Sequence, residues 1–253
     1  MLEAKHVSVA YGKIKILDDV SFRADKGDWL MIVGPNGAGK STMIDAVSRG
    51  VDYEGSILLD GQDIRHISAR QRARNMGVLR QNHFVSYAFT VGEVVRMGRY
   101  ARGGLFMQER GGEEQVERAL EMTGLRDIEQ QSVLTLSGGE LQRTFIAQLF
   151  AQDPKLLLLD EPSNHLDLVY QQQIFELISR WIRETGNTVI SVVHDLSLAR
   201  KYGTHALMLH KGRVKGSGEA RKVLTRERLE EVYEIDVYSW MQEMLSQWEE
   251  QEK

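Results

Sequence analysis

Gly34-Pro-Asn-Gly-Ala-Gly-Lys-Ser-Thr42 is the stretch from which the rest of the chain can be interpreted. It fits the pattern G-x-x-x-x-G-K-[ST], with Gly34, Gly39, Lys40 and Ser41 at the fixed positions. Glycines allow successive backbone N–H groups to point at one anion, and the lysine adds a positive charge for phosphate oxygens. The serine hydroxyl is a typical ligand of the Mg²⁺ that accompanies a nucleotide. The stretch therefore predicts a binding site for a nucleoside triphosphate.

The segments on either side of this stretch support the same interpretation. Residues 29–33 have the pattern of a buried strand, and Ser41 to Arg49 predict a helix that ends at Gly50. A strand, a loop and a helix in this order direct the helix N-terminus at the phosphates, where the helix dipole favours negative charge. The alternative is a chance glycine-rich turn, which the flanking strand and helix disfavour.

Composition limits the possible classes of function. The chain has 253 residues, a net charge of −4 and a pI of about 6.0, so no overall basic field predicts a nucleic-acid partner. It has no cysteine, which excludes disulfides and thiolate metal sites and suits a reducing compartment. We find no signal peptide, and apolar runs such as Leu156 to Leu159 are far shorter than the ~20 residues of a membrane span. These features predict a soluble protein, for which a membrane role would require partner subunits.

The chain divides into a nucleotide-binding core and a helical insertion. Residues 82–135 show helical periodicity around a glycine-rich loop, whereas the segments before and after them contain strand-like runs. Leu156 to Leu159 and Thr188 to Val193 are largely apolar runs, typical of parallel strands that are buried on both faces. We predict a domain of residues 1–238, with the helical lobe at residues 82–135, followed by a C-terminal tail of residues 239–253.

Two acids follow the buried strand at residues 156–159. Asp160, at the end of a strand beside the phosphate loop, is placed to hold Mg²⁺ directly or through water. The neighbouring carboxylate of Glu161 points elsewhere and is suited to orient or deprotonate an attacking water. The alternative is a strand that ends in a solvated turn, which the phosphate loop earlier in the chain disfavours.

A second helix start has the features of an anion site. Ser137 and Glu140 in Leu136-Ser-Gly-Gly-Glu140 have the spacing of a capping box, which predicts that Ser137 caps a helix running to Ala151. Two glycines in the first turn leave backbone N–H groups uncovered, so this terminus is also suited to phosphate. A capping box by itself would indicate only an ordinary helix start.

With Gly34–Thr42, Leu136–Glu140 and Leu156–Glu161 in this order, the chain resembles the nucleotide-binding subunits of ATP-binding cassette (ABC) proteins. The resemblance covers residues 2–220. It implies an α/β fold, namely a P-loop NTPase core with a mostly parallel sheet, an N-terminal antiparallel β segment and the inserted helical lobe. It also implies a second copy of the chain, because in that family the Leu-Ser-Gly-Gly-Gln motif of one subunit completes the ATP site of its partner in a head-to-tail dimer.

The resemblance gives roles to residues that carry little information alone. Gln81 matches a glutamine that touches Mg²⁺ and the attacking water, and His194 matches a histidine that contacts the γ-phosphate. Tyr11 matches an aromatic residue that stacks on adenine, and Ser163–Asp167 matches a loop at the dimer seam. A lone histidine or tyrosine at such a place would more often be a packing residue.

The cofactors implied are ATP and Mg²⁺. The expected catalytic residues are Lys40, Gln81, Glu161 and His194, and the expected Mg²⁺ ligands are Ser41, Gln81 and Asp160. The expected nucleotide contacts are Tyr11, Gly34, Pro35, Asn36, Gly37, Ala38, Gly39, Lys40, Ser41, Thr42, Ser137, Gly138, Gly139 and Asp167.

Three positions depart from the family pattern. Glu140 stands where glutamine is commonest, a frequent variant that preserves the capping box. Asn164-His165 replaces the more usual small residues in the loop at the seam.

A narrower resemblance points to one class of transporter. Residues 85–100 and 223–237 look like the corresponding segments of importers for iron–siderophore, haem and cobalamin. This implies an ATP-hydrolysing subunit that is peripheral at the cytoplasmic face of the membrane. Its implied partners are transmembrane permease subunits and, indirectly, a solute-binding protein. The transported compound would be set by those partners, and the tail after Ser239 resembles nothing familiar.

Two other classes of function agree less well with the sequence. A nucleic-acid-handling cassette ATPase would have a long coiled coil between the phosphate loop and the signature, or two phosphate loops, and this sequence has neither. A regulatory cassette that only binds ATP would not need Lys40, Asp160, Glu161 and His194 together. Phe84, Tyr87 and Phe89 follow Gln81 closely, and they favour either a groove for a partner helix or packing inside the helical lobe.

Overall fold

The core of the protein is a mixed six-stranded sheet. The structure is a computed structural model of the whole chain and describes residues 1–81, 87–103 and 112–248. In that described part, the strand order is β10-β9-β3-β8-β7-β6. All neighbouring strands run parallel except β10, which pairs antiparallel with β9. The strands are β3 (Trp29–Val33), β6 (Met76–Leu79), β7 (Leu156–Asp160), β8 (Thr188–Val192), β9 (His205–His210) and β10 (Arg213–Glu219).

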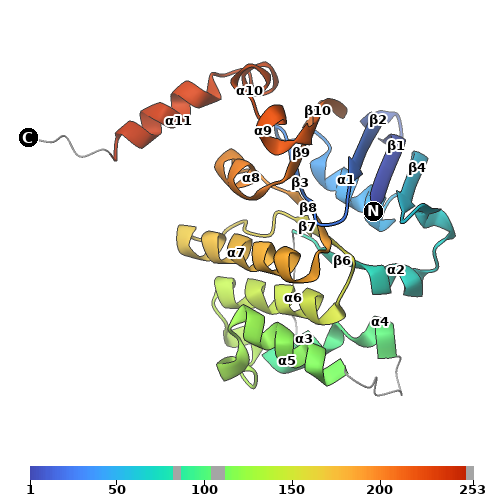
Figure 1. Cartoon of the computed structure of the whole chain (residues 1–253), viewed down its shortest axis with the longest axis vertical. Helices are drawn as coiled ribbons and strands as arrows, with labels where there is room; N and C mark the ends of the chain where they lie inside the picture. Colours follow the sequence, from blue (N-terminus) through green and yellow to red (C-terminus); the bar gives the residue numbers. More distant parts are fainter. Residues whose placement is uncertain (82–86, 104–111, 249–253) are drawn as a thin grey trace, which may run out of the picture.

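A second sheet of four antiparallel strands lies beside the first (Figure 1), in the order β2-β1-β4-β5. Its strands are β1 (Leu2–Tyr11), β2 (Ile14–Ala24), β4 (Glu54–Leu59) and β5 (Gln62–Asp63). Helix α1 (Lys40–Ser48) packs between the two sheets, because its Met43, Ile44 and Val47 join one buried cluster with side chains from both. The predicted α/β fold, with a mostly parallel sheet and an antiparallel N-terminal segment, is confirmed.

The opposite face of the large sheet is covered by helices α6 (Gly138–Gln152), α7 (Leu168–Thr185) and α8 (Leu196–Tyr202). Aromatic rings join these layers. The rings of Trp29 in β3 and Phe175 in α7 stack at a centroid distance of 5.3 Å, and those of Phe150 and Trp181 stack at 5.5 Å. Helices α6 and α7 therefore have fixed positions over the strands that end at the candidate site.

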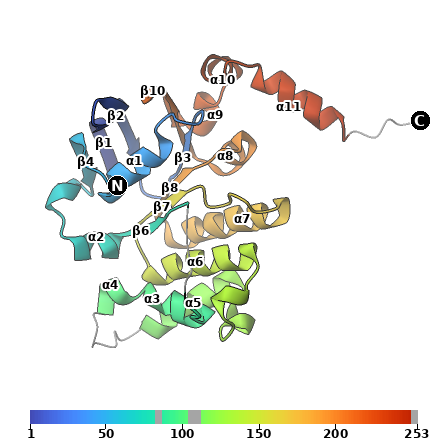
Figure 2. The same ribbon diagram turned by 180° about the vertical axis from the view of Figure 1, so that it is seen from behind.

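The helical lobe lies on the far side of α6 from the sheet, where Figures 1 and 2 show α3 and α5 packed beneath it. Its described helices are α3 (Val91–Met97), α4 (Tyr100–Gly103) and α5 (Gly112–Thr123), and α2 (Ala69–Asn75) precedes it. Three short 3-10 helices are η1 (Ile64–His66), η2 (Arg126–Ile128) and η3 (Val133–Thr135). Residues 82–86, and so Phe84, lie outside the described residues, as does most of the glycine-rich loop.

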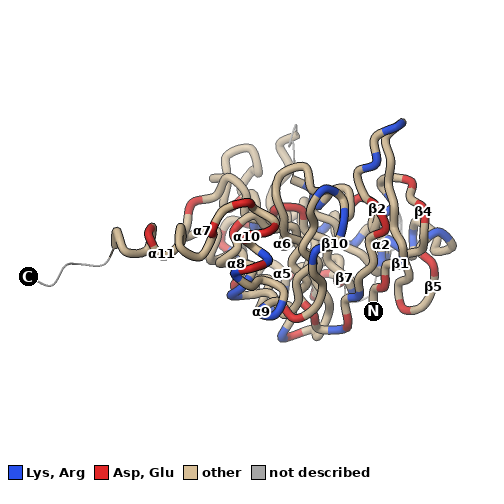
Figure 3. Tube along the Cα trace, turned by 90° about the horizontal axis from the view of Figure 1, so that it is seen from above, with Lys and Arg blue, Asp and Glu red and all other residues tan. Residues whose placement is uncertain are grey.

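The C-terminal segment consists of α9 (Ala220–Val223), α10 (Arg226–Tyr233) and α11 (Val237–Ser246). Helix α11 begins before the boundary at residue 238 that the sequence suggests, and it projects from the body of the molecule in all three views (Figures 1–3). Figure 3 also shows basic and acidic residues interspersed along the described trace.

Candidate functional site

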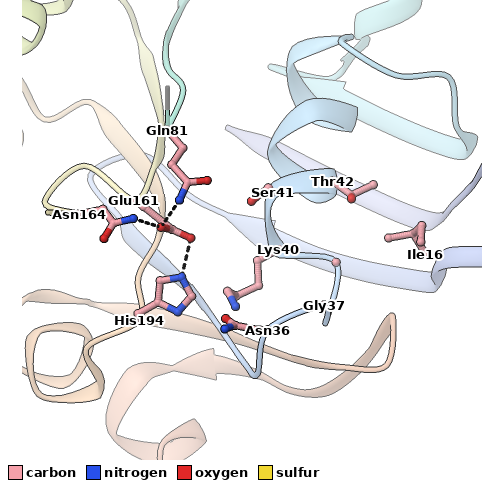
Figure 4. Close-up of a pocket in the computed structure, with 11 residues that line it drawn as sticks. Ile16, Asn36, Gly37, Lys40, Ser41, Thr42, Gln81, Glu161, Asn164 and His194 are labelled. Carbon is pink, nitrogen blue, oxygen red and sulfur yellow. Dashed lines mark hydrogen bonds and ion pairs between the residues drawn. The ribbon is translucent and has the colours of Figure 1, made fainter. Parts of the chain in front are cut away.

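A cavity of about 640 Å³ opens where β3, β6, β7 and β8 end (Figure 4). The carboxyl ends of parallel strands form this edge, which is where α/β folds bind ligands. The cavity is lined by Ile16, Asn36, Gly37, Gly39, Lys40, Ser41, Thr42, Gln81, Glu161, Asn164 and His194. Nine of these eleven residues are expected site residues of the phosphate loop and the strand ends, and the other two are Ile16 and Asn164.

The backbone of the phosphate loop requires glycine at two fixed positions. Gly34 and Gly39 have φ angles of 146° and 96°, which residues with a side chain rarely adopt. A Cβ on Gly34 would lie 2.1 Å from the carbonyl oxygen of Leu209, and one on Gly39 would lie 2.6 Å from Cδ2 of Leu17. The loop is therefore a tight cradle that ends in the N-terminus of α1, which fits a bound phosphate chain.

Lys40 is held inside this cradle by the backbone. Its Nζ donates hydrogen bonds to the carbonyl oxygens of Gly34 (2.8 Å) and Pro35 (3.0 Å). Burial lowers the pKa of the Lys40 ammonium, while the nearby charges of Glu161 and Asp160 oppose that shift. A phosphate oxygen would be a stronger acceptor than a carbonyl, because both partners would then be charged. Lys40 is thus placed to exchange carbonyl contacts for phosphate contacts.

Ser41 and Asp160 form the candidate Mg²⁺ site. Ser41 Oγ donates a hydrogen bond to Asp160 Oδ1 at 3.1 Å. Burial raises the pKa of Asp160, the Ser41 hydrogen bond opposes that shift, and the charge of Glu161 adds to it. A divalent cation would offset the cost of this buried charge. Two hard oxygen donors side by side fit Mg²⁺, which normally completes its shell with water and substrate phosphates.

Mg²⁺ binding at Ser41 and Asp160 does not require a complete set of protein ligands. Within the described ranges, no group of three or more His, Cys, Asp or Glu side chains is arranged to hold a metal ion. Magnesium in phosphate-transfer sites is typically bound by only one or two carboxylates. The Ser41–Asp160 pair is consistent with that pattern.

Glu161 is the centre of a hydrogen-bond cluster in the cavity (Figure 4). Its Oε2 accepts from Gln81 Nε2 at 2.8 Å and from Asn164 Nδ2 at 2.8 Å, and its Oε1 lies 2.5 Å from His194 Nε2. Gln81 follows β6 and His194 follows β8, so three separate segments meet at one carboxylate. The side chain of Glu161 is 10% exposed. This arrangement is suited to hold a carboxylate against a water molecule that approaches from the cavity.

Residues 136–140, here called the signature segment, fold as expected but do not line the cavity. Ser137 caps α6, and its backbone N–H and Oγ both donate to Glu140 Oε2, at 2.8 and 2.7 Å. These bonds lower the pKa of Glu140. Ser137 and Gly138 are exposed, whereas Gly139 is buried. The cavity lining includes none of the three, so this second helix terminus is not part of the cavity of its own chain.

Six further expected site residues are also absent from the cavity lining, namely Gly34, Pro35, Ala38, Asp160, Tyr11 and Asp167. Tyr11 ends β1 with 53% of its surface exposed, and Asp167 caps α7 by accepting from the N–H of Tyr170 at 3.0 Å. Conversely, Ile16 and Asn164 line the cavity although no motif in the sequence predicts them there. The only available signal was that Asn164 departs from the family pattern. Ile16 is at the site because β2 crosses beside Gly39.

Comparisons with known proteins agree with this geometry. Residues 17–164 match the family model described as ABC transporter. The ferric enterobactin transport ATP-binding protein FepC of Escherichia coli is 37% identical over 234 residues, which are 92% of this chain and 86% of FepC. The hemin import ATP-binding protein HmuV of Bradyrhizobium diazoefficiens is 36% identical over 245 residues, with coverage of 93% and 89%.

A solved structure shows the same fold in a dimer. A bacterial ABC transporter cassette, described as dimeric, superposes with a TM-score of 0.77 at 27% identity. The match covers 87% of this chain and 99% of the cassette. The exposed signature segment therefore has a counterpart in a protein that pairs two copies.

Proposed function

The chain belongs to the ABC transporter family, and from this premise we propose that it hydrolyses ATP to energise the import of a metal chelate such as an iron–siderophore complex, haem or cobalamin. The observation that carries the proposal is the 37% identity to a ferric enterobactin transport protein over nearly the whole chain. The 36% identity to a hemin import protein supports the same class of cargo. Family members of this kind are ATPases, and this chain has every residue type that the reaction needs.

In the proposed reaction, the chain's own residues bind and orient the reactants. The N–H groups of the phosphate loop and Lys40 hold the β- and γ-phosphates, and Ser41 and Asp160 hold Mg²⁺. When bound, Mg²⁺ neutralises developing charge on the phosphate oxygens. Glu161 polarises the attacking water, and its carboxylate is oriented by hydrogen bonds from Gln81 and His194.

We further propose that each ATP is bound between two copies of the chain. Ser137, Gly138 and Gly139 offer backbone N–H groups and a hydroxyl at a helix terminus that does not line the cavity of its own chain. In a head-to-tail dimer this terminus would contact the γ-phosphate on the partner, and Asp167 would lie at the seam. The dimeric state of the related cassette supports this arrangement.

The proposed setting is the cytoplasmic face of a membrane, where the chain is peripheral and contacts transmembrane permease subunits. A solute-binding protein would deliver the chelate to the permease from the other side. Relatives that are named as import or transport ATP-binding proteins support this assignment. In the described ranges of the chain, we find no helix of the length and apolarity that a membrane crossing needs.

Reconstitution tests the proposal. The chain would be co-expressed with candidate permease subunits and placed in vesicles, with a ferric siderophore, haem and cobalamin offered in turn through the binding protein of that permease. ATP-dependent accumulation of one of these chelates is expected with the unchanged chain and not with Glu161→Gln. That variant keeps the shape of the side chain but loses the base. Hydrolysis without uptake of any of the three chelates would contradict the proposed cargo.

A further inference from the structure

Asn164 occupies an unusual place in the wall of the cavity. It lies in the loop of residues 162–167, shortly after strand β7, which ends at Asp160 and is followed by Glu161. Its Nδ2 donates to Glu161 Oε2 at 2.8 Å, and its Oδ1 accepts from the backbone N–H of His165 at 3.0 Å. Its own backbone N–H donates to the carbonyl oxygen of Glu161 at 3.1 Å. One side chain therefore contacts both Glu161, as Figure 4 shows, and the backbone of His165.

Both residues that Asn164 joins have an unfavourable backbone conformation. Glu161 has a φ of 54° and His165 a φ of 62°, in the left-handed region that residues with a side chain rarely adopt. Such conformations persist when surrounding contacts hold them. The two hydrogen bonds of the Asn164 side chain are contacts of that kind. A small apolar residue at position 164 would provide neither.

The three donors on Glu161 are not equivalent. Gln81 and His194 follow strands β6 and β8 of the central sheet, whereas Asn164 belongs to the loop between β7 and α7. That loop is also tied to the signature helix, because Gln142 in α6 donates to the carbonyl oxygen of Pro162 at 2.6 Å. The orientation of the Glu161 carboxylate is thus set by the sheet on one side and by a surface loop on the other.

We infer that Asn164 is a positioning residue for ATP hydrolysis, whose amide fixes the Glu161 carboxylate and makes its orientation depend on the loop of residues 162–167. The inference rests on the proposed function, in which Glu161 polarises the attacking water. Asn164 acts through Glu161, so its loss lowers turnover without weakening ATP binding.

The isosteric change Asn164→Asp tests this role in the full-length chain. Aspartate retains an oxygen that can accept from the N–H of His165, but it replaces the donor to Glu161 with a second negative charge. We expect kcat for ATP to fall about 10- to 100-fold, as for a misplaced catalytic group, with KM for MgATP changed by less than about twofold. The matched control is Asn187→Asp, the same change at a half-buried asparagine whose Nδ2 donates to the carbonyl oxygen of Pro154 and which does not line the cavity. The control should keep kcat within about twofold of the unchanged chain.

A second readout isolates the contact itself. By like-charge repulsion, Asn164→Asp should lower the melting temperature of the nucleotide-free chain by about 2–4 °C. In a Glu161→Gln background the same change should not lower it, because the glutamine amide can donate to the new aspartate. A wild-type kcat for Asn164→Asp, or melting-temperature shifts that simply add in the double variant, would overturn the inference.

Failure of the proposed function would give a different result. If Glu161→Gln alone still hydrolyses ATP, Glu161 is not the base, and the positioning role of Asn164 falls with it. If Glu161→Gln is inactive but Asn164→Asp is fully active, only the role of Asn164 is rejected.

Discussion

The signature glycine Gly139 packs directly against the ring of Tyr170, since a Cβ built on Gly139 would lie 2.4 Å from Cδ1 of that ring. Tyr170 is in the first turn of α7, where its backbone N–H donates to the capping carboxylate of Asp167. The first turn of α6 and the start of α7 are therefore one packed unit. Within this unit Gly138 remains exposed, and the nearest atom to a Cβ on it would be 3.9 Å away.

The first prediction compares the two glycines of the signature. Gly139→Ala should destabilise the chain by about 1–3 kcal/mol, as overpacking does, and lower the melting temperature by several degrees. Gly138→Ala meets open space and replaces glycine with a better helix former, so it should leave the melting temperature unchanged or slightly higher. Thermal unfolding of both variants measures the difference. Equal melting temperatures would show that the Tyr170 ring moves aside at no cost.

Much of the fold and of the site could be predicted because its signals are local. The buried strand β3, the phosphate loop and the capping box at Ser137 each depend on residues close together in the sequence. The contacts that were missed join distant or unusually shaped segments. Asn164 contacts Glu161 across a turn in which the backbone of Glu161 is left-handed, and Ile16 reaches the cavity from β2, which passes beside Gly39 of the phosphate loop. Neither contact can be predicted from residue type alone.

The second prediction concerns the buried charge of Asp160. Burial raises the pKa of Asp160 above its ordinary value of 3.8, so the folded state binds this proton more tightly than the unfolded state. The contribution of Asp160 to stability therefore falls as pH rises from 3.8 through the raised pKa, and it stays low above it. Asp160→Asn removes the charge and should raise the melting temperature of the nucleotide-free chain at neutral pH.

The pH dependence is the control for that explanation. The gain in melting temperature should shrink as the pH is lowered through the raised pKa and should vanish below 3.8, where aspartate is protonated in both states. The same variant should bind Mg²⁺ more weakly, by at least about 10-fold, measured as the Mg²⁺ concentration that half-saturates hydrolysis. A gain in stability that is independent of pH would contradict the assignment to charge burial.

The third prediction tests Tyr11 as the residue that stacks on adenine. Its ring is 53% exposed at the end of β1, so Tyr11→Ala should leave the melting temperature unchanged. Stacking is worth about 0.5–1.5 kcal/mol, which corresponds to a KM for ATP about 2- to 13-fold higher with kcat nearly intact. Steady-state kinetics with ATP measure this. An unchanged KM would indicate that other residues, such as Ile16, hold the base.

The fourth prediction concerns the aromatic residues that follow Gln81. The rings of Tyr87 and Phe89 lie 6.0 Å apart, and the two residues are 71% and 38% exposed. Exposed neighbouring aromatics suit a contact with a permease helix. Tyr87→Ser should reduce chelate uptake in reconstituted vesicles while the isolated chain hydrolyses ATP at its normal rate. A lowered melting temperature would instead indicate packing within the lobe.

The last prediction is that the phosphate loop of one chain faces the signature of another. The chain has no cysteine, so any disulfide that forms must join the introduced thiols. Ala38 and Gly139 are poor positions for thiols, because Ala38 is 3% exposed and Gly139 is covered by Tyr170. Asn36 and Gly138 are exposed alternatives on the two segments. We would mix an Asn36→Cys chain with a Gly138→Cys chain, both carrying Glu161→Gln to retain ATP.

ATP should produce a cross-link between these two different chains. A disulfide requires Cα atoms within about 7 Å, and a short bifunctional reagent extends that reach if the pair is slightly farther apart. Each single-cysteine chain alone is the control, because a dimer with signature against signature would link the Gly138→Cys chain to itself. Nucleotide binding by the Asn36→Cys chain is checked separately, since Asn36 lines the cavity. A site shared head to tail brings these two segments together when the nucleotide is bound. Cross-linking that does not depend on ATP, or that occurs only between identical chains, would therefore contradict this arrangement.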